Sequence, residues 1–265
     1  YFCASINIFM ATYKKRGHKP RTGAEQEAAV EDQSTTAEVF NTLDEGAGKT
    51  EAWVAKNQKF IFIIIGAAAL VVLGYLGYNQ FIQEPKEAEA ANEMFQAQQY
   101  FETALTAPAA QSDSLFNLAL NGGEGKYGFL DIIEDYGNTD AGNLARYSAG
   151  MAFLNTNKYD EAIKHLDKFK SDDMVLSALA KGAIGDAFLQ LDQPEEALNY
   201  YAEAAKMRDN SFTTPRFLLK AAITALNLGE AGKAEGFLIS IKEDYPNSPQ
   251  ADQVDVYLGQ AQAMN

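Results

Sequence analysis

A run of 19 uncharged and mostly apolar residues, at positions 60–78, constrains this chain more than any other feature. It reads FIFIIIGAAALVVLGYLGY. A helix rises about 1.5 Å per residue, so the run is long enough to cross the hydrocarbon core of a bilayer. A buried core helix would usually keep a polar edge, and a cleaved signal peptide would end in small residues. The run therefore predicts a transmembrane helix over residues 60–82.

Aromatic residues lie toward both ends of this run. Trp53 precedes it, Phe60 opens it, and Tyr75 and Tyr78 close it. Aromatic rings of this kind favour the boundary between lipid and water. We therefore expect these four side chains to anchor the helix in the membrane.

The charges on either side of the run predict its orientation. Residues 1–59 hold eight basic and eight acidic residues, so residues 79–265 carry the whole net charge of −14. Lys56 and Lys59 directly precede the run, whereas acidic residues dominate after it. By the positive-inside rule, the N-terminus is cytoplasmic and residues 79–265 are translocated. A chain with a net charge of −14 lacks the basic stripe that phosphate binding needs, so we expect no nucleic-acid partner.

The segment before the span is predicted to be a cytoplasmic, largely disordered tail. Residues 1–9 are expected to derive from upstream sequence, because Met10 opens a hydrophilic stretch that resembles a natural start. Residues 11–33 are polar and mixed in charge, which is typical of disorder. A short amphipathic stretch follows, and we expect Gly46 and Gly48 to interrupt it.

Beyond the predicted span, the chain repeats itself at the period of a helical hairpin. Gly150 precedes Ala162 by 12 residues. Gly185 precedes Ala197 by the same 12, so the two units are offset by 35 residues. A third and weaker copy has an alanine, Ala222, in place of the glycine. This spacing predicts pairs of antiparallel helices.

Small residues at these positions would let the backbones of two helices approach closely. Larger side chains are expected to fill the space beside them, namely Phe153, Leu166, Phe188 and Tyr201. The order of glycine, aromatic residue, alanine and proline resembles the tetratricopeptide repeat family. That resemblance implies an all-α fold, in which a single N-terminal transmembrane helix is followed by a helical solenoid.

The repeats divide the outer part of the chain into three segments. Residues 83–139 are predicted to form a degenerate first repeat, with helices at 84–105 and 126–136 and an insertion between them. Residues 140–248 are predicted to form about three hairpins. Residues 249–265 are predicted to form a capping helix, which a solenoid needs to cover its last apolar face.

Signatures of catalysis are weak. Gly46 to Thr50 ends like a phosphate-binding loop, but the first glycine of that motif would fall at Leu43. A similar glycine-rich stretch at residues 122–126 is followed by Tyr127, where a magnesium-binding Ser or Thr is required. We interpret both glycine-rich stretches as flexible joints, and we expect no enzymatic activity and no cofactor.

A metal site is equally improbable. The chain has one cysteine, Cys3, and two histidines, His18 and His165, which are far apart in the sequence. His165 is expected on an exposed helix face. A zinc site usually takes four such ligands, so we predict no metal.

A protein-binding groove is the remaining hypothesis. In tetratricopeptide repeats the first helix of each hairpin lines a concave surface, and a mixed polar and apolar lining suits a peptide or a partner helix. The candidate residues are Tyr147, Met151, Asn155, Asp186, Gln190, Arg216, Lys220 and Asn227.

The layout as a whole resembles the YfgM-like family, whose members are ancillary subunits of the bacterial Sec translocon. The resemblance rests on residues 51–57 (EAWVAKN), the span itself and the repeats that begin soon after it. It implies a single-pass protein of the bacterial inner membrane with periplasmic repeats. It also implies association with the SecYEG channel, a membrane-anchored peptidyl-prolyl isomerase foldase and nascent chains.

Two other functions stay open at this point. The chain could be a scaffold in envelope assembly or cell division that does not contact nascent chains. It could also be an import receptor on an organelle, which would require the repeats to face the cytosol.

Overall fold

The computed structural model describes residues 35–207 and 209–264, and the chain divides into two compact units, Tyr1–Gly74 and Tyr75–Asn265. The expectations for residues 1–34 lie outside the described residues. Within the described ranges the regular elements are helices, and the only β-pairing is an isolated bridge between Gly123 and Lys126. The predicted all-α class is therefore confirmed.

The described part of the first unit belongs to one helix, α2 (Thr35–Tyr78). This helix passes through Gly46 and Gly48 without a break, so the expected interruption, and with it the first flexible joint, is wrong. A glycine costs about 1 kcal/mol in a helix relative to alanine, and once a helix has formed each further residue adds a hydrogen bond. The good helix formers around both glycines offset that cost.

The candidate span is part of a longer helical run. Helix α2 continues through a π-helical segment, η1 (Asn79–Gln83), into α3 (Glu84–Thr106). Among the described residues, one stretch, Trp53–Thr106, is long and apolar enough to cross a membrane, and none of its most apolar window is buried. The predicted boundaries at residues 60–82 do not coincide with a separate helix. The span therefore remains an expectation based on length and composition.

The four predicted anchor residues lie in α2. The side chains of Trp53, Phe60, Tyr75 and Tyr78 are each more than half exposed. Nothing in the described part of the protein covers them. An apolar surface of this size is unusual for a protein surrounded only by water.

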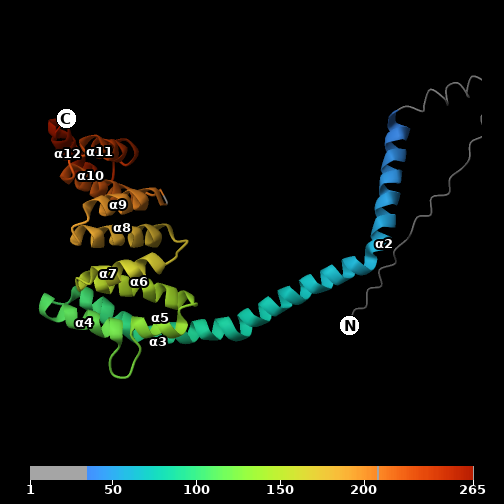
Figure 1. The fold of residues 1–265 in the computed structure, drawn as a ribbon, viewed down its shortest axis with the longest axis horizontal. Helices are drawn as coiled ribbons and strands as arrows, with labels where there is room; N and C mark the ends of the chain where they lie inside the picture. The colour runs from blue at the N-terminus through green and yellow to red at the C-terminus, as the bar shows by residue number, and fades with distance from the viewer. Residues whose placement is uncertain (1–34, 208, 265) are drawn as a thin grey trace, which may run out of the picture. The chain divides into compact units, whose positions relative to one another are not determined.

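Successive helical hairpins make up the second unit (Figure 1). The helices that follow α3 are α4 (Ala109–Asn121), α5 (Phe129–Tyr136), α6 (Asp140–Asn155), α7 (Tyr159–Lys168), α8 (Met174–Gln190), α9 (Pro194–Met207), α10 (Thr214–Asn227), α11 (Ala231–Asp244) and α12 (Ala251–Met264). Each packs mainly against its neighbours in the chain, and α3 also packs against α6.

Helix α4 occupies the segment that was predicted to be an insertion. Its residues Phe116, Ala119 and Leu120 are buried, and the ring of Phe116 packs edge-on against Phe101 of α3 at 5.6 Å. The apolar spacing of i, i+3 and i+4 is helical, but it is short and follows a polar stretch around Ser112. We attribute the formation of this helix to the burial of its apolar side chains against α3.

The close approach predicted within the hairpins is confirmed. A Cβ atom added to Gly150 would lie 2.5 Å from Cγ of Leu166 and 3.3 Å from the carbonyl oxygen of Ala162. A Cβ atom added to Gly185 would lie 2.7 Å from the ring of Tyr201. Glycine is therefore the residue that allows the second helix of each hairpin to approach the first.

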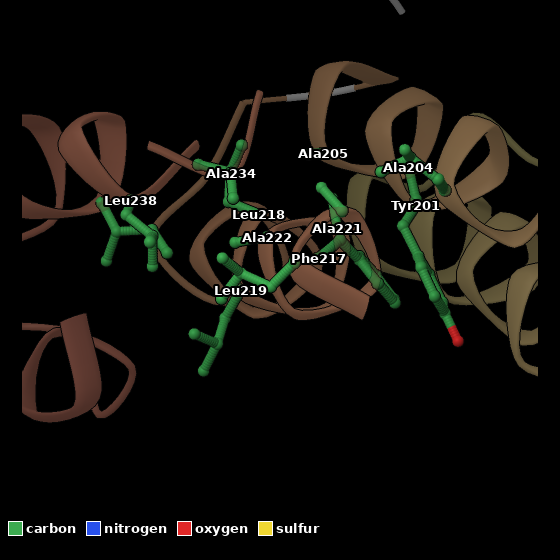
Figure 2. Packing of buried hydrophobic residues seen from close by; sticks show 14 of the residues in the cluster. Tyr201, Ala204, Ala205, Phe217, Leu218, Leu219, Ala221, Ala222, Ala234 and Leu238 are labelled. Atoms are coloured by element: carbon green, nitrogen blue, oxygen red, sulfur yellow. The ribbon is translucent and has the colours of Figure 1, made fainter. Parts of the chain in front are cut away.

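The core follows the stack as three clusters of buried side chains. One lies within α3–α7, a small one joins α6 to α8, and the largest runs from α8 to α12. Figure 2 shows the part of the largest cluster that α9, α10 and α11 contribute, with Phe217 near several alanines. Alanine is frequent in these clusters, which fits helices packed at short distance.

Candidate protein-binding surface

The first helices of the three hairpins are α6, α8 and α10. All eight residues that were predicted to line a groove lie on them. We call this set the first-helix surface: Tyr147, Met151 and Asn155 on α6, Asp186 and Gln190 on α8, and Arg216, Lys220 and Asn227 on α10.

A hollow of about 440 Å³ brings three of these residues together. Asn155 contributes from the end of α6, and Asp186 and Gln190 contribute from the second half of α8. The hydroxyl of Tyr159 donates to Oδ1 of Asn157 at 2.7 Å and lies 3.5 Å from Oε1 of Gln190. The remaining lining residues are Leu154, Asn157 and Leu189. Amide, carboxylate and aliphatic groups in one hollow suit a peptide with both backbone and apolar contacts.

Asp186 is the centre of a polar network that links two repeats. Its Oδ1 accepts a hydrogen bond of 2.6 Å from the hydroxyl of Tyr201 on α9 and forms an ion pair with Lys220 on α10. The ammonium group of Lys220 also lies 5.4 Å from the centre of the Tyr201 ring. Asp186 and Lys220 were expected as exposed groove residues, but both are half-buried and paired with each other. Burial and the carboxylate of Asp186 raise the pKa of Tyr201 far above its usual value of 10, so its hydroxyl remains a donor.

Tyr147 and Met151 have a larger packing role than was predicted. The Tyr147 ring lies 5.2 Å from that of Phe169, and both predicted residues pack against the cluster that joins α6 to α8. Burial raises the pKa of Tyr147, while the positive charge of Arg216 acts in the opposite direction. These two residues of the first-helix surface therefore also pack against the core.

Arg216 and Asn227 are exposed near opposite ends of α10. Within the described residues Arg216 makes no ion pair, and its guanidinium lies 6.0 Å from the ring of its neighbour Phe217. Asn227 does not join the hollow around Asn155. The structure thus brings Asn155, Gln190 and Lys220 together around Asp186, whereas Asn227 lies outside the hollow.

Two residues with clear roles were absent from the prediction. Tyr159 lines the hollow because it opens α7, directly after the turn that follows Asn155. That turn length is a sequence signal which could have identified it. Tyr201 was expected only as a core residue beside Gly185, and its hydroxyl contact with Asp186 depends on the tertiary structure.

His165 differs from its prediction. Its side chain is only 13% exposed, and its ring lies 5.3 Å from that of Phe153. Burial lowers the pKa of His165, partly opposed by Glu161. The expected exposed helix face is therefore wrong, because the packing of α7 against α6 covers this side of the helix.

No phosphate-loop geometry accompanies the second glycine-rich motif. Gly122 and Gly125 have positive φ angles of 77° and 72° in a tight turn between α4 and α5, closed by the bridge from Gly123 to Lys126. This geometry is that of a turn between two helices, and the flexible joint expected here stays a prediction. Among residues 35–207 and 209–264, no group of three or more potential metal ligands is found.

The tetratricopeptide repeat family model matches residues 144–173, which cover most of α6 and α7. No protein with a curated description matches the chain. The match and the all-helical structure of the described residues together support a protein built on tetratricopeptide repeats. Repeats of this family typically mediate protein–protein interaction and are not catalytic.

Proposed function

We propose that this chain is a non-enzymatic membrane-anchored adaptor whose first-helix surface binds segments of partner proteins. The observation that carries the proposal is the hollow around Asn155, Asp186 and Gln190, which adjoins the repeat identified at residues 144–173. The exposed apolar stretch of α2 supports attachment to a bilayer.

The partner that we propose is the bacterial Sec translocon. The architecture resembles that of YfgM-like subunits, with a tail, a span and a repeat domain in the same order. On this proposal the repeats are periplasmic, and they assist emerging chains together with a membrane-anchored foldase. A scaffold in envelope assembly or cell division is the alternative, because the same surface could hold a structural partner.

Site-specific photo-crosslinking in cells tests the surface and the partner together. A photoreactive residue at position 155 should give adducts with translocon or foldase subunits. The matched control is Asn199, which is exposed on the second helix α9 and should give few adducts. Adducts with envelope-assembly proteins would support the scaffold, and equal labelling at both positions would contradict a binding role of the first-helix surface.

A protease experiment tests the orientation. Periplasmic repeats should be protected in intact cells and digested in spheroplasts. Protection in spheroplasts would place the repeats in the cytosol, which contradicts the translocon proposal and favours an import receptor.

A further inference from the structure

One formal charge lies in the described lining of the hollow of about 440 Å³, and it is negative. Asp186 carries it, and the other lining side chains are amides, leucines and the phenol of Tyr159. All of them come from α6, the turn after it, the start of α7 and the last turns of α8. Helix α10, which the structure describes throughout, contributes none, so Lys220 reaches Asp186 from outside the hollow. The charge that a ligand meets in this lining is therefore a carboxylate.

One oxygen of this carboxylate can still accept a hydrogen bond from a ligand. Both contacts of Asp186 use Oδ1, which accepts from the hydroxyl of Tyr201 at 2.6 Å and pairs with Lys220. Within residues 35–207 and 209–264 no group bonds to Oδ2, and the Asp186 side chain is 34% exposed. Hydrogen bonds to an ionised group are about twice as strong as neutral ones. Oδ2 therefore favours a ligand that brings a charged donor.

The amide side chains of the lining supply further acceptors. Nδ2 of Asn155 donates to a backbone carbonyl oxygen one turn earlier in α6, at 2.8 Å, which leaves its Oδ1 for a ligand. The hydroxyl of Tyr159 donates to Asn157, so Oε1 of Gln190, at 3.5 Å, receives at most a weak contact from it. The NH₂ groups of Asn157 and Gln190 can donate to the carbonyl oxygens of a peptide backbone. The hollow thus suits a peptide segment with a strong donor in one side chain.

Two leucines give the same hollow an apolar wall. Leu154 is half-buried, and Leu189 is 41% exposed. Arginine and lysine lay their methylene stems along apolar surface and keep their charged heads among polar groups. A purely aliphatic side chain would leave the oxygens of the lining without donors, and a short polar one would leave the leucines uncovered. A long cationic side chain matches both parts of the lining.

The chain that continues from the hollow adds negative charge. Residues 190–196 begin with a lining residue and hold Asp192, Glu195 and Glu196 but no basic residue. Asp160 directly follows Tyr159 of the lining. These four carboxylates are exposed, and in the part of the chain that the structure describes none of them forms an ion pair. Charges act over about 10 Å at an ionic strength of 0.1 M, so this surrounding favours the approach of a cation.

The basic residues of these repeats lie away from the hollow or are already paired. Arg216 belongs to the first turn of α10, whereas the hollow lies at the last turns of α6 and α8, and the first helices of stacked hairpins run in the same direction. Lys158 points its ammonium group at Asn117 of α4, at 3.4 Å. Lys220 is occupied by its ion pair within the protein. An acidic ligand would therefore find no cation in the lining itself.

We propose that this hollow binds a cationic side chain, arginine or lysine, of an extended segment of a partner protein. The stem of that side chain packs along Leu154 and Leu189, and its charged head donates to Oδ2 of Asp186 and to the amide oxygens beside it. The inference rests on the proposed binding role of the first-helix surface and names the chemistry of the segment that this surface takes.

Selection from a library of short random peptides tests the preference on the full chain. The protein is held in phosphatidylcholine nanodiscs, whose neutral lipid does not attract cations, and empty nanodiscs give the background. We expect the retained peptides to carry arginine or lysine beside an apolar residue several-fold more often than the starting library. Enrichment of aspartate or glutamate would overturn the cationic ligand and leave a binding surface. If no peptide is retained above the background, the proposed binding role fails together with this inference.

Charge changes at Gln190 test where a selected peptide binds. Gln190 lines the hollow and is exposed, so its variants should fold. For a peptide with one arginine, Gln190→Glu should lower the Kd about threefold and Gln190→Lys should raise it about threefold, as for partly exposed charge pairs. The matched control makes the same two changes at Asn199, which is exposed on α9, and should leave the Kd unchanged. Equal effects at both positions would show a non-specific attraction and overturn the proposal.

A double-mutant cycle tests the contact with Asp186 itself. It combines Asp186→Asn with a peptide in which glutamine replaces the arginine, so that a general loss of stability in the variant cancels. We expect Asp186→Asn to raise the Kd of the arginine peptide about threefold more than that of the glutamine peptide. The matched control is Asp252→Asn, which removes an exposed carboxylate from α12 and should show no such difference. Equal losses for the two peptides in Asp186→Asn would overturn the proposed contact.

Discussion

The carboxylate of Glu87 accepts a hydrogen bond of 2.8 Å from the backbone N–H of Ala141, a residue 54 positions further along the chain. Helix N-termini leave several N–H groups without partners inside the helix, and a negative charge there is favourable. In α6, Thr139 satisfies the N–H of Gly142, and Glu87 satisfies two more from a different helix. The first helix of the domain thus completes the start of the matched repeat.

Replacing Glu87 should loosen this junction. We expect Glu87→Ala to lower the free energy of unfolding by about 0.5–2 kcal/mol, the range measured for lost helix caps. Thermal unfolding of the full chain in detergent, followed by circular dichroism, measures the change. The matched control is Glu102→Ala, which removes an exposed carboxylate from the same helix. Equal effects of the two variants would contradict the capping role.

Two glycines should respond in opposite directions to alanine. A Cβ atom at Gly182 would lie 1.8 Å from the ring of Phe217, so Gly182→Ala should cost about 1–3 kcal/mol through overpacking. No atom lies within 4 Å of a Cβ atom at Gly236, so Gly236→Ala should stabilise α11 by about 0.5–1 kcal/mol. Comparing their melting temperatures checks both. A stabilising Gly182→Ala would show that α8 and α10 are not in close contact.

The pair formed by Asp186 and Lys220 should show measurable coupling. A double-mutant cycle with Asp186→Asn and Lys220→Met is expected to give about 0.5–1 kcal/mol, because both side chains are half-buried. The control cycle uses Lys242 and Asp255, whose ion pair of 2.7 Å is far more exposed, and it should give less. Chemical denaturation of the four proteins in each cycle supplies the energies. A larger coupling energy between Lys242 and Asp255 than between Asp186 and Lys220 would contradict the expectation that burial strengthens the latter pair.

His165 should make stability depend on pH. Burial lowers the pKa of its imidazole below the ordinary value of 6.5, so the unfolded chain binds the proton more readily. This contribution to stability is complete above pH 6.5 and is lost as the pH falls through the lowered pKa of the folded state. Melting temperatures measured from about pH 7.5 down to about pH 5 should fall further in the natural protein than in His165→Gln. Parallel curves would show that the imidazole is equally accessible in both states.

Local sequence patterns predicted a large part of the fold. The Gly150 and Gly185 spacings predicted the hairpins because close packing of two helices depends on residues within one repeat. The helix α4 was missed because its apolar positions are few, and contact with α3 is what stabilises it. Gly46 and Gly48 led to the opposite error, a predicted break where the helix continues. The helix-forming residues around them outweigh the low helix propensity of glycine.

The candidate site was only partly predictable. The residues of the first-helix surface could be selected by helical period, since they recur at fixed positions in each hairpin. The pairing of Asp186 with Lys220 and Tyr201 could not, because it joins α8, α9 and α10. The burial of His165 could not be predicted either, because it depends on the packing of α7 against α6.

The sequence by itself determined the apolar run, the acidic character of the residues that follow it and the period of the repeats, because each depends on composition or on residues close together in the chain. The tertiary structure alone decided which polar groups pair and which end of the repeats receives the chain from its apolar stretch. The physical reason is distance along the chain. Glu87 and Ala141 come into contact only when α3 packs against α6. The residues next to each of them in the sequence do not indicate that contact.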